Sequence, residues 1–265
     1  MQLLRRPEIR ADDARRLVMV SDLHIWGPGD PLCRGLTRFV RETLEPGDAF
    51  FIVGDLFDFF VGTKQVFTEK YVDLFNALRD AGRRGVNIVY LEGNHDFDLK
   101  HSFVGAEGVR VMQGEFVVRW DGRRVLFSHG DGINAKDYGY KAWRMALHNP
   151  LTKLIIAATP GDFVSAVGVK LSGASRAYND QADDATVTLF RNYACEQISR
   201  GCDFVVMGHS HYLDDIKFQC GEHKGQYVNN GFPRRDHRFL VIERGEPYIR
   251  TESWRDFILP TAGCR

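Results

Sequence analysis

Five short apolar runs in this chain each lead directly into an acid, an asparagine or a histidine. The runs occupy residues 17–20, 49–53, 86–91, 125–127 and 204–207. They are rich in β-branched and aromatic side chains, and glycine or polar residues follow them. Such runs are typical of buried strands. The sequence therefore predicts sheet strands that end in polar residues able to carry chemistry.

Helical patterns separate several of these runs. Apolar residues recur at helical spacing in 32–44, in 71–78 and in 185–200, while 227–249 resembles two or three closing strands. An alternation of strands and helices predicts an α/β domain with a largely parallel core. Ligands of such sheets bind beyond the carboxyl ends of the strands. We therefore expect the polar residues to gather at one edge of one sheet.

The segment from 131 to 182 differs from the rest of the chain. It has no clear strand, it carries several aromatic residues, and the breaks Asn149-Pro150 and Thr159-Pro160-Gly161 interrupt it. We expect a helical insertion over the site, within a single domain that spans 1–265. Its apolar part, 154–171, contains the second break and makes a poor membrane-spanning helix. Two interpretations are open for this part, namely internal packing and a groove for lipid.

The charge balance and the cysteines restrict the class of protein. There are 35 Lys and Arg against 35 Asp and Glu, which gives no support for a broad nucleic-acid surface. The odd set of five cysteines (33, 195, 202, 220 and 264) lacks Cys-x-x-Cys pairs and predicts free thiols in a reducing compartment. Met1–Asp13 lacks the apolar region of a secretory signal. We expect a cytoplasmic protein, with contact to the inner face of the membrane left open.

Seven residues at the ends of the predicted strands have side chains of the kind that binds metal ions. They are Asp22, His24, Asp55, Asn94, His129, His209 and His211. Taken singly, each is also compatible with a satisfied polar group at a strand end. Together they offer too many ligands for one four-coordinate zinc but suit two divalent ions. Oxygen and nitrogen donors without thiolate favour Mn²⁺, Fe²⁺ or Zn²⁺, and two such ions can clamp a phosphoryl group and generate a hydroxide nucleophile.

The order of these motifs resembles the calcineurin-like metallophosphoesterase superfamily. Asp-x-His, Gly-Asp-x-x-Asp, Gly-Asn-His-Asp, His-Gly-Asp and Gly-His-x-His follow one another between Asp22 and His211. The resemblance implies an α/β fold, a two-layer β-sandwich flanked by helices, with a dinuclear site. One ion, Mn²⁺ in the first instance, is expected on Asp22, His24 and His211. The other is expected on Asn94, His129 and His209, with Asp55 as the bridge.

The same resemblance implies roles for two neighbouring residues. His95 is expected to protonate the leaving oxygen or to stabilise the transition state, and Asp96 is expected to orient His95. Asp58, in the Gly-Asp-x-x-Asp motif, is expected to support its loop rather than to take part in catalysis. A hydroxide that bridges the two ions is expected to attack phosphorus in line.

A closer resemblance is to the UDP-2,3-diacylglucosamine pyrophosphohydrolase family of the lipid A pathway. It rests on Gly54-Asp55-Leu56-Phe57-Asp58 and on the spacing of the residues that follow His129-Gly130-Asp131. The resemblance implies that the 131–182 segment is a lid for acyl chains. The implied substrate contacts are Asn94, His95, Asp137, Tyr140, Arg144, Ser175 and Arg176. For Tyr140 and Arg144, packing of the lid against the core is an equal alternative.

The expected reaction is therefore hydrolysis of UDP-2,3-diacylglucosamine to UMP and a diacylated sugar 1-phosphate at the inner face of the membrane. The main branch of that family has arginine where this chain has His95. This departure keeps open a metallophosphoesterase with another substrate, such as a nucleotide, a phosphodiester or a phosphoprotein. A scaffold without chemistry is disfavoured because all the ligand positions are filled. The cluster 234–238 is either a solvated turn or a site for a phosphate or an anionic headgroup.

Overall fold

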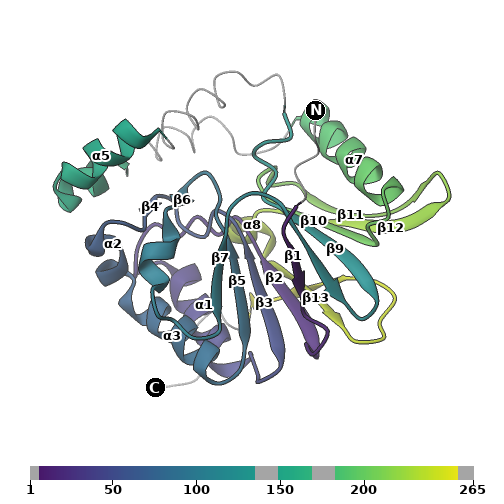
Figure 1. The fold of residues 1–265 in the computed structure, drawn as a ribbon, viewed down its shortest axis with the longest axis horizontal. Helices are drawn as coiled ribbons and strands as arrows, with labels where there is room; N and C mark the ends of the chain where they lie inside the picture. Colours follow the sequence, from purple (N-terminus) through teal and green to yellow (C-terminus); the bar gives the residue numbers. More distant parts are fainter. Residues whose placement is uncertain (1–5, 135–148, 169–182, 256–265) are drawn as a thin grey trace.

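A computed structural model of the chain describes residues 6–134, 149–168 and 183–255. Two six-stranded sheets pack face to face, and helices cover their outer faces (Figure 1). The two-layer β-sandwich flanked by helices is thereby confirmed. The extent of the domain, 1–265, stays a prediction.

The first sheet contains the first three predicted strands. Its central strands run parallel, and the two at one edge, β13 and β14, run antiparallel to their neighbours. In spatial order the strands are β14 (Arg250–Ser253), β13 (Arg238–Glu243), β2 (Arg16–Val20), β3 (Asp48–Val53), β5 (Asn87–Leu91) and β7 (Val109–Met112). The register pairs Val20 with Ile52 and Val53 with Leu91, so β2, β3 and β5 end side by side.

The second sheet contains the other two predicted strands. In spatial order it consists of β1 (Glu8–Arg10), β8 (Phe116–Trp120), β9 (Arg123–Ser128), β10 (Phe204–Met207), β12 (His223–Asn230) and β11 (Leu213–Cys220). Met207 is in register with Ser128, so β9 and β10 also end together. The expectation of one edge of one sheet is therefore wrong. The polar residues follow strands of both sheets, because the apolar runs carry no signal that assigns them to one sheet or the other.

The helices and the remaining short elements lie outside the two sheets. They are α1 (Pro31–Glu42), α2 (Gln65–Lys70), α3 (Val72–Arg83), η1 (Leu99–Phe103), α5 (Pro150–Ala158), α7 (Asp184–Ser199), α8 (Pro233–Asp236) and the pair β4 (Phe60–Val61) and β6 (Asp96–Phe97). The helices predicted over 32–44, 71–78 and 185–200 correspond to α1, α3 and α7. Helix α1 begins after Asp30, whose side chain accepts a 3.0 Å hydrogen bond from the Leu32 amide.

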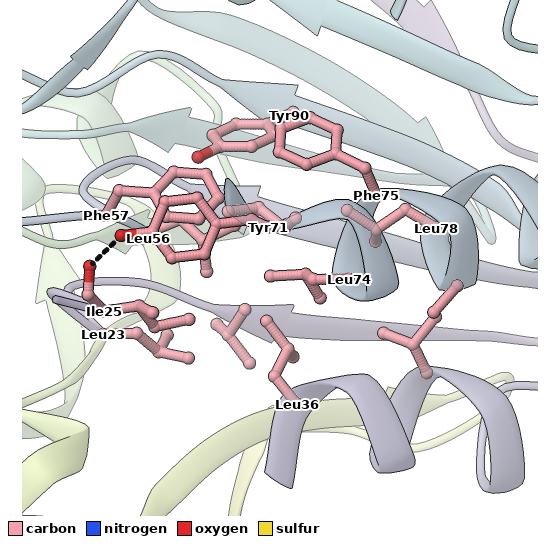
Figure 2. Packing of buried hydrophobic residues seen from close by; sticks show 14 of the residues in the cluster. Leu23, Ile25, Leu36, Leu56, Phe57, Tyr71, Leu74, Phe75, Leu78 and Tyr90 are labelled. Atoms are coloured by element: carbon pink, nitrogen blue, oxygen red, sulfur yellow. Dashed lines mark hydrogen bonds between the residues drawn. The ribbon is translucent and has the colours of Figure 1, made fainter. Parts of the chain in front are cut away.

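Alternating residues of the strands build separate layers of the core. Leu17, Met19 and Phe51 face the other sheet. Val18 and Phe50, which alternate with them, face α1 and α3. In that outer layer, aromatic and leucine side chains of α3 meet those of the loop after β3 (Figure 2). The Tyr71 hydroxyl, which is buried among them, donates to the Ile25 carbonyl at 3.3 Å. The packing fixes the loops that carry Asp22, His24 and Asp55 to a rigid support.

Within the 131–182 segment, most of the described stretch 149–168 is helical, in agreement with the prediction, while 131–134 form a turn and coil. The helical part comprises α5 and a second helical stretch over 161–168. This part contacts the core beside β4 and α2. A Cβ at Gly168 would lie 2.0 Å from the Phe59 ring, and Lys64 Nζ donates to the Thr159 carbonyl at 2.6 Å. Among the described residues, no helix has both the length and the apolar character needed to cross a bilayer.

The cysteines correct one expectation. Cys195 of α7 and Cys220 of β11 form a disulfide. Five free thiols were expected because the two residues are 25 positions apart and no spacing pattern pairs them. Their proximity arises from the packing of α7 on the β11–β12 hairpin, an element that the sequence analysis did not predict. Cys33 and Cys202 are free and buried, and Cys264 lies outside the described residues.

Candidate active site

The seven predicted ligands come together where strands of the two sheets end. Asp22 and His24 follow β2, Asp55 follows β3, and Asn94 follows β5. From the second sheet, His129 follows β9, and His209 and His211 follow β10. The structure thus gathers residues that are up to 189 positions apart, from 22 to 211, at one end of the sandwich. Their roles as ligands stay a prediction, which the geometry below supports.

One group of ligand atoms is formed by Asp22, His24 and His211. Their ligand atoms all lie within 4.8 Å of one another. The Nε2 atoms of His24 and His211 are 3.1 Å apart, and Nε2 of His211 is 3.6 Å from Oδ1 of Asp22. We call this group the first cluster. It has the donors and the spacing that a single divalent ion requires.

A second group is formed by Asp55, His129 and His209, with Asn94 beside it. Nε2 of His129 lies 3.3 Å from Oδ2 of Asp55 and 3.1 Å from Oδ1 of Asn94. The same Oδ2 atom of Asp55 is 3.8 Å from Nε2 of His24 in the first cluster. We call Asn94, His129 and His209 the second cluster. The Asp55 carboxylate therefore faces both clusters, as a bridging ligand must.

Backbone strain is concentrated at these positions. Five of the predicted ligands have positive φ angles, which non-glycine residues rarely adopt. They are Asp22 (54°), His24 (45°), Asp55 (50°), His209 (65°) and His211 (54°). Such strain gathers at functional sites, where the surrounding structure maintains it. The tight loops place both side chains of Asp22-x-His24 in the first cluster, and they direct His211 to the first cluster and His209 to the second.

The glycines of the motifs leave space for the ligand carboxylates. A Cβ at Gly93 would lie 2.1 Å from Oδ1 of Asp55, and one at Gly208 would lie 2.5 Å from Oδ2 of Asp22. Real Cβ atoms do not approach other atoms this closely, so any larger residue would displace the carboxylates. The requirement explains why glycine precedes Asn94 and His209.

Two buried atoms of the first cluster have no hydrogen-bond partner among the described residues. They are Oδ2 of Asp22 and Nδ1 of His24. An unsatisfied buried polar atom is unfavourable by roughly 1–3 kcal/mol, so native proteins usually pair it or bind an ion there. Together with the oxygen and nitrogen donors of both clusters, these atoms fit divalent cations.

The protonation states also suit metal binding. Burial lowers the pKa of His209 to about 4, so the ring is neutral at pH 7 and its nitrogen can bind an ion. Burial opposes ionisation of Asp55, but the nearby His129 outweighs it and holds the pKa of that carboxyl well below its usual value. Burial likewise disfavours a charged His129, but the Asp55 carboxylate raises the pKa of the ring well above its usual value. A metal ion must therefore displace a proton from His129.

His95 lies next to the first cluster and is held by Asp58. Its ring packs edge-on against that of His24, with centroids 4.8 Å apart. Its Nδ1 atom lies 2.7 Å from the carbonyl oxygen of Asp58, and its amide donates to Oδ1 of Asp55 at 2.9 Å. The main-chain carbonyl of Asp58 thus contacts the candidate catalytic residue directly. The supporting role expected for the Asp58 side chain stays a prediction.

The structure does not give Asp96 the role expected from the resemblance. Its buried carboxylate accepts hydrogen bonds from the amides of residues 55, 56 and 93 and from the Tyr90 hydroxyl, at 2.5–3.2 Å. In the described structure, the ring of His95 is oriented by Asp58 instead. Asp96 is completely buried and ties the loops after β3 and β5 together. Burial raises the pKa of Asp96 to about 6.

Five predicted substrate contacts cannot be placed. Asp137, Tyr140, Arg144, Ser175 and Arg176 lie outside the described residues. A hollow of about 360 Å³ beside Asp58 was not predicted. Trp26, Phe59, Phe67, Lys70, Tyr71 and Ser165 also line it. The position of Trp26 two residues after His24 is the one sequence signal that could have pointed to this hollow.

Comparisons with known proteins identify the family of the chain. A family model described as calcineurin-like phosphoesterase matches residues 15–213. The chain is 27% identical, over 195 residues, to a UDP-2,3-diacylglucosamine hydrolase of Photorhabdus laumondii, covering 73% of this chain and 81% of that relative. A protein of the same name from Aeromonas salmonicida is 29% identical over 198 residues, covering 73% and 76%.

Among solved structures, the chain is similar to that of an archaeal phosphodiesterase. The sequence identity is 14%, the TM-score is 0.43, and the match covers 89% of this chain and 98% of the other. The family match carries the assignment, because it extends over most of the chain and includes every predicted ligand. The chain belongs to the calcineurin-like phosphoesterase family and is a metal-dependent phosphoester hydrolase.

Proposed function

We propose that the protein hydrolyses the pyrophosphate bond of UDP-2,3-diacylglucosamine, at the cytoplasmic face of the inner membrane, to UMP and 2,3-diacylglucosamine 1-phosphate. The observation that carries the proposal is the position of the Asp55 carboxylate, with Oδ2 within 4 Å of Nε2 in both His24 and His129. This arrangement would hold two divalent ions, Mn²⁺ in the first instance, close to one phosphoryl group. Relatives with this enzyme's name cover most of the chain and support the choice of substrate.

The residues of the chain divide the work between them. Asp22, His24 and His211 would hold one ion, Asn94, His129 and His209 would hold the other, and Asp55 would be shared between them. Bound ions supply charge neutralisation at the phosphoryl oxygens and an acidified water as nucleophile. The Nδ1–H of His95 donates a hydrogen bond to the Asp58 carbonyl, so the proton given to the leaving oxygen would come from a protonated Nε2. This choice of general acid follows from geometry.

The apolar hollow supports a substrate with acyl chains. Four aromatic residues line it, together with Asp58, Lys70 and Ser165 of the 131–182 segment: Trp26, Phe59, Phe67 and Tyr71. Trp26 is 48% exposed, which is unusual for so large an apolar side chain. An acyl chain placed here would cover Trp26 while the phosphates remain at the two clusters.

The proposal is tested by phosphorus NMR of the Mn²⁺-loaded protein with UDP-2,3-diacylglucosamine in detergent micelles. We expect signals of UMP and of a sugar 1-phosphate, with the Asp55→Asn variant as the inactive control. UDP-N-acetylglucosamine, which has the same pyrophosphate but no long chains, is expected to react at least tenfold more slowly. Turnover of a simple phosphodiester without any of the pyrophosphate would contradict the proposal. That result would favour the alternative of another phosphoester substrate.

A further inference from the structure

The turn after β12 lies against the first cluster. It consists of Phe232, Pro233, Arg234 and Arg235, and we call these four residues the brace. The sequence analysis left 234–238 as a solvated turn or an anion site. In the described structure, Arg234 and Arg235 donate to the main-chain carbonyls of His24 and His211, respectively. They also pair with the carboxylates of Asp30 and Asp236.

Arg234 holds the loop that carries His24. Its Nη2 atom donates to the His24 carbonyl at 2.9 Å and to the Leu23 carbonyl at 3.3 Å. The same atom is 2.7 Å from Oδ2 of Asp30, a fully buried carboxylate that caps α1. Arg234 is therefore fixed by a rigid helix end, and it fixes the strained backbone of His24 in turn.

Arg235 holds the loop that carries His211. Its Nη2 atom donates to the His211 carbonyl at 2.8 Å. Asp236 binds the same guanidinium through two hydrogen bonds of 2.8 and 2.9 Å, and its Oδ2 atom also accepts from the Phe232 amide. Bidentate pairing of this kind fixes the plane of an arginine. The carbonyl of His211, whose φ is 54°, is thus held from the same turn.

Phe232 restricts the two imidazole rings themselves. Its ring stacks on that of His211 with centroids 4.8 Å apart and an angle of 15° between planes. It meets the ring of His24 at 6.1 Å and 62°. One turn of the chain therefore orients both histidines of the first cluster, through the backbone and through the rings.

We propose that the brace positions His24 and His211 and thereby sets the affinity of the first cluster for its metal ion, separately from the second cluster. Partners that orient metal ligands typically change affinity by about 10–100-fold when they are removed. Here the effect is specific because the contacts described go to one cluster. The inference rests on the proposed two-ion site, and Phe232, Arg234 and Arg235 are positioning residues.

The test is a Mn²⁺ titration of chelator-treated protein by calorimetry. We expect Arg235→Met to weaken one of two binding events by about 10–100-fold and to leave the other within about twofold. His211→Ala and His209→Ala identify which binding event belongs to which cluster. Arg235→Met is expected to weaken the same event as His211→Ala. Arg238→Met is the matched control, because the exposed Arg238 side chain makes no hydrogen bond or ion pair with the described residues.

Two further measurements separate positioning from folding. The apo forms of Arg235→Met and Arg238→Met are expected to unfold at similar temperatures, and excess Mn²⁺ is expected to restore kcat of Arg235→Met. Phe232→Leu provides the same test if Arg235→Met does not fold. Equal weakening of both events, or none, would refute the role of the brace. Wild-type protein that binds fewer than two ions would refute the proposed function as well.

Discussion

Nδ1 of His95 lies 2.7 Å from the main-chain carbonyl oxygen of Asp58 and donates a hydrogen bond to it. A backbone carbonyl only accepts hydrogen bonds, which fixes the tautomer of the neutral ring. Oδ1 of Asp58 is also 3.9 Å from Nδ1 of His24. One loop residue thus lies against both the proposed general acid and a ligand of the first cluster.

This contact predicts the effect of His95→Ala. The variant is expected to keep both metal ions and to lose about 10²–10⁴-fold in kcat, the usual contribution of a general acid. The loss should shrink for an aryl ester such as p-nitrophenyl phosphate derivatives, whose leaving oxygen needs no proton. Metal analysis and steady-state kinetics check both statements. An equal loss on the good and the poor leaving group would assign His95 to charge stabilisation instead.

Asp55→Asn tests the shared carboxylate. The substitution keeps the size of the side chain but removes the charge that faces both clusters, so we expect fewer than two ions per chain and no measurable hydrolysis. Inductively coupled plasma mass spectrometry and phosphorus NMR provide the measurements. Asp73→Asn, on the exposed first turn of α3, is the matched control. Two bound ions with full activity in Asp55→Asn would exclude a bridging role.

Metal binding should release a proton at pH 7. His129, whose pKa the Asp55 carboxylate raises despite burial, is protonated in the apo protein and must be neutral as a ligand. His209, whose pKa burial lowers to about 4, has no proton to release. The apparent affinity for Mn²⁺ should therefore rise about tenfold per pH unit between pH 5 and 7. Calorimetry in buffers of different ionisation enthalpy counts the protons, and a count of zero would contradict the assignment.

The hollow beside Asp58 predicts a selective effect of Trp26→Ala. Removal of the half-exposed indole takes away apolar contact area, so KM for UDP-2,3-diacylglucosamine should rise by about tenfold or more with little change in kcat. KM for UDP-N-acetylglucosamine should stay the same. Val104→Ala, at a highly exposed apolar residue outside the hollow, is the control. A similar rise for both substrates would mean that Trp26 supports the site and does not contact acyl chains.

The cysteines should differ in reactivity. Burial raises the pKa of Cys33 to about 11, so at pH 8 only about one thiol in a thousand is ionised and alkylation of the folded protein should be slow. In denaturant without reductant, Cys33 and Cys202 should be labelled, while Cys195 and Cys220 should stay protected by their disulfide. Peptide mass spectrometry reads each site. Labelling of all four cysteines would contradict the disulfide between Cys195 and Cys220.

The sequence predicted the elements near the site well, because they depend on local patterns. The five apolar runs became β2, β3, β5, β9 and β10, and α1, α3 and α7 lie where helical spacing predicted them. The predicted ligands are close together in space, because each directly follows the end of a strand. Periodicity and position at a strand end can both be read from neighbouring residues.

Relationships between distant segments could not be predicted in the same way. Nothing local indicates that β9 and β10 belong to a different sheet from β2, or that Cys195 meets Cys220 across α7 and β11. The role of Asp96 was misjudged for the same reason. Its hydrogen-bond partners are amides and a hydroxyl that only the folded loops bring together. The contacts of Arg234 and Arg235 with the first cluster could not be predicted from a motif. Their acceptors in His24 and His211 are main-chain carbonyls, which every residue has.

The left-handed backbone at five predicted ligands lowers the stability of the fold at positions that the proposed activity requires. Glycine adopts positive φ without the steric penalty that aspartate and histidine incur, a penalty of roughly 1–3 kcal/mol at each such residue. Replacement of His211 by glycine should therefore leave a chain at least as resistant to unfolding in the absence of metal, yet inactive. Selection for robustness alone would remove the site residue by residue. A chain that retains all five residues is less stable than it could be, and the retained function of the site is what accounts for this cost.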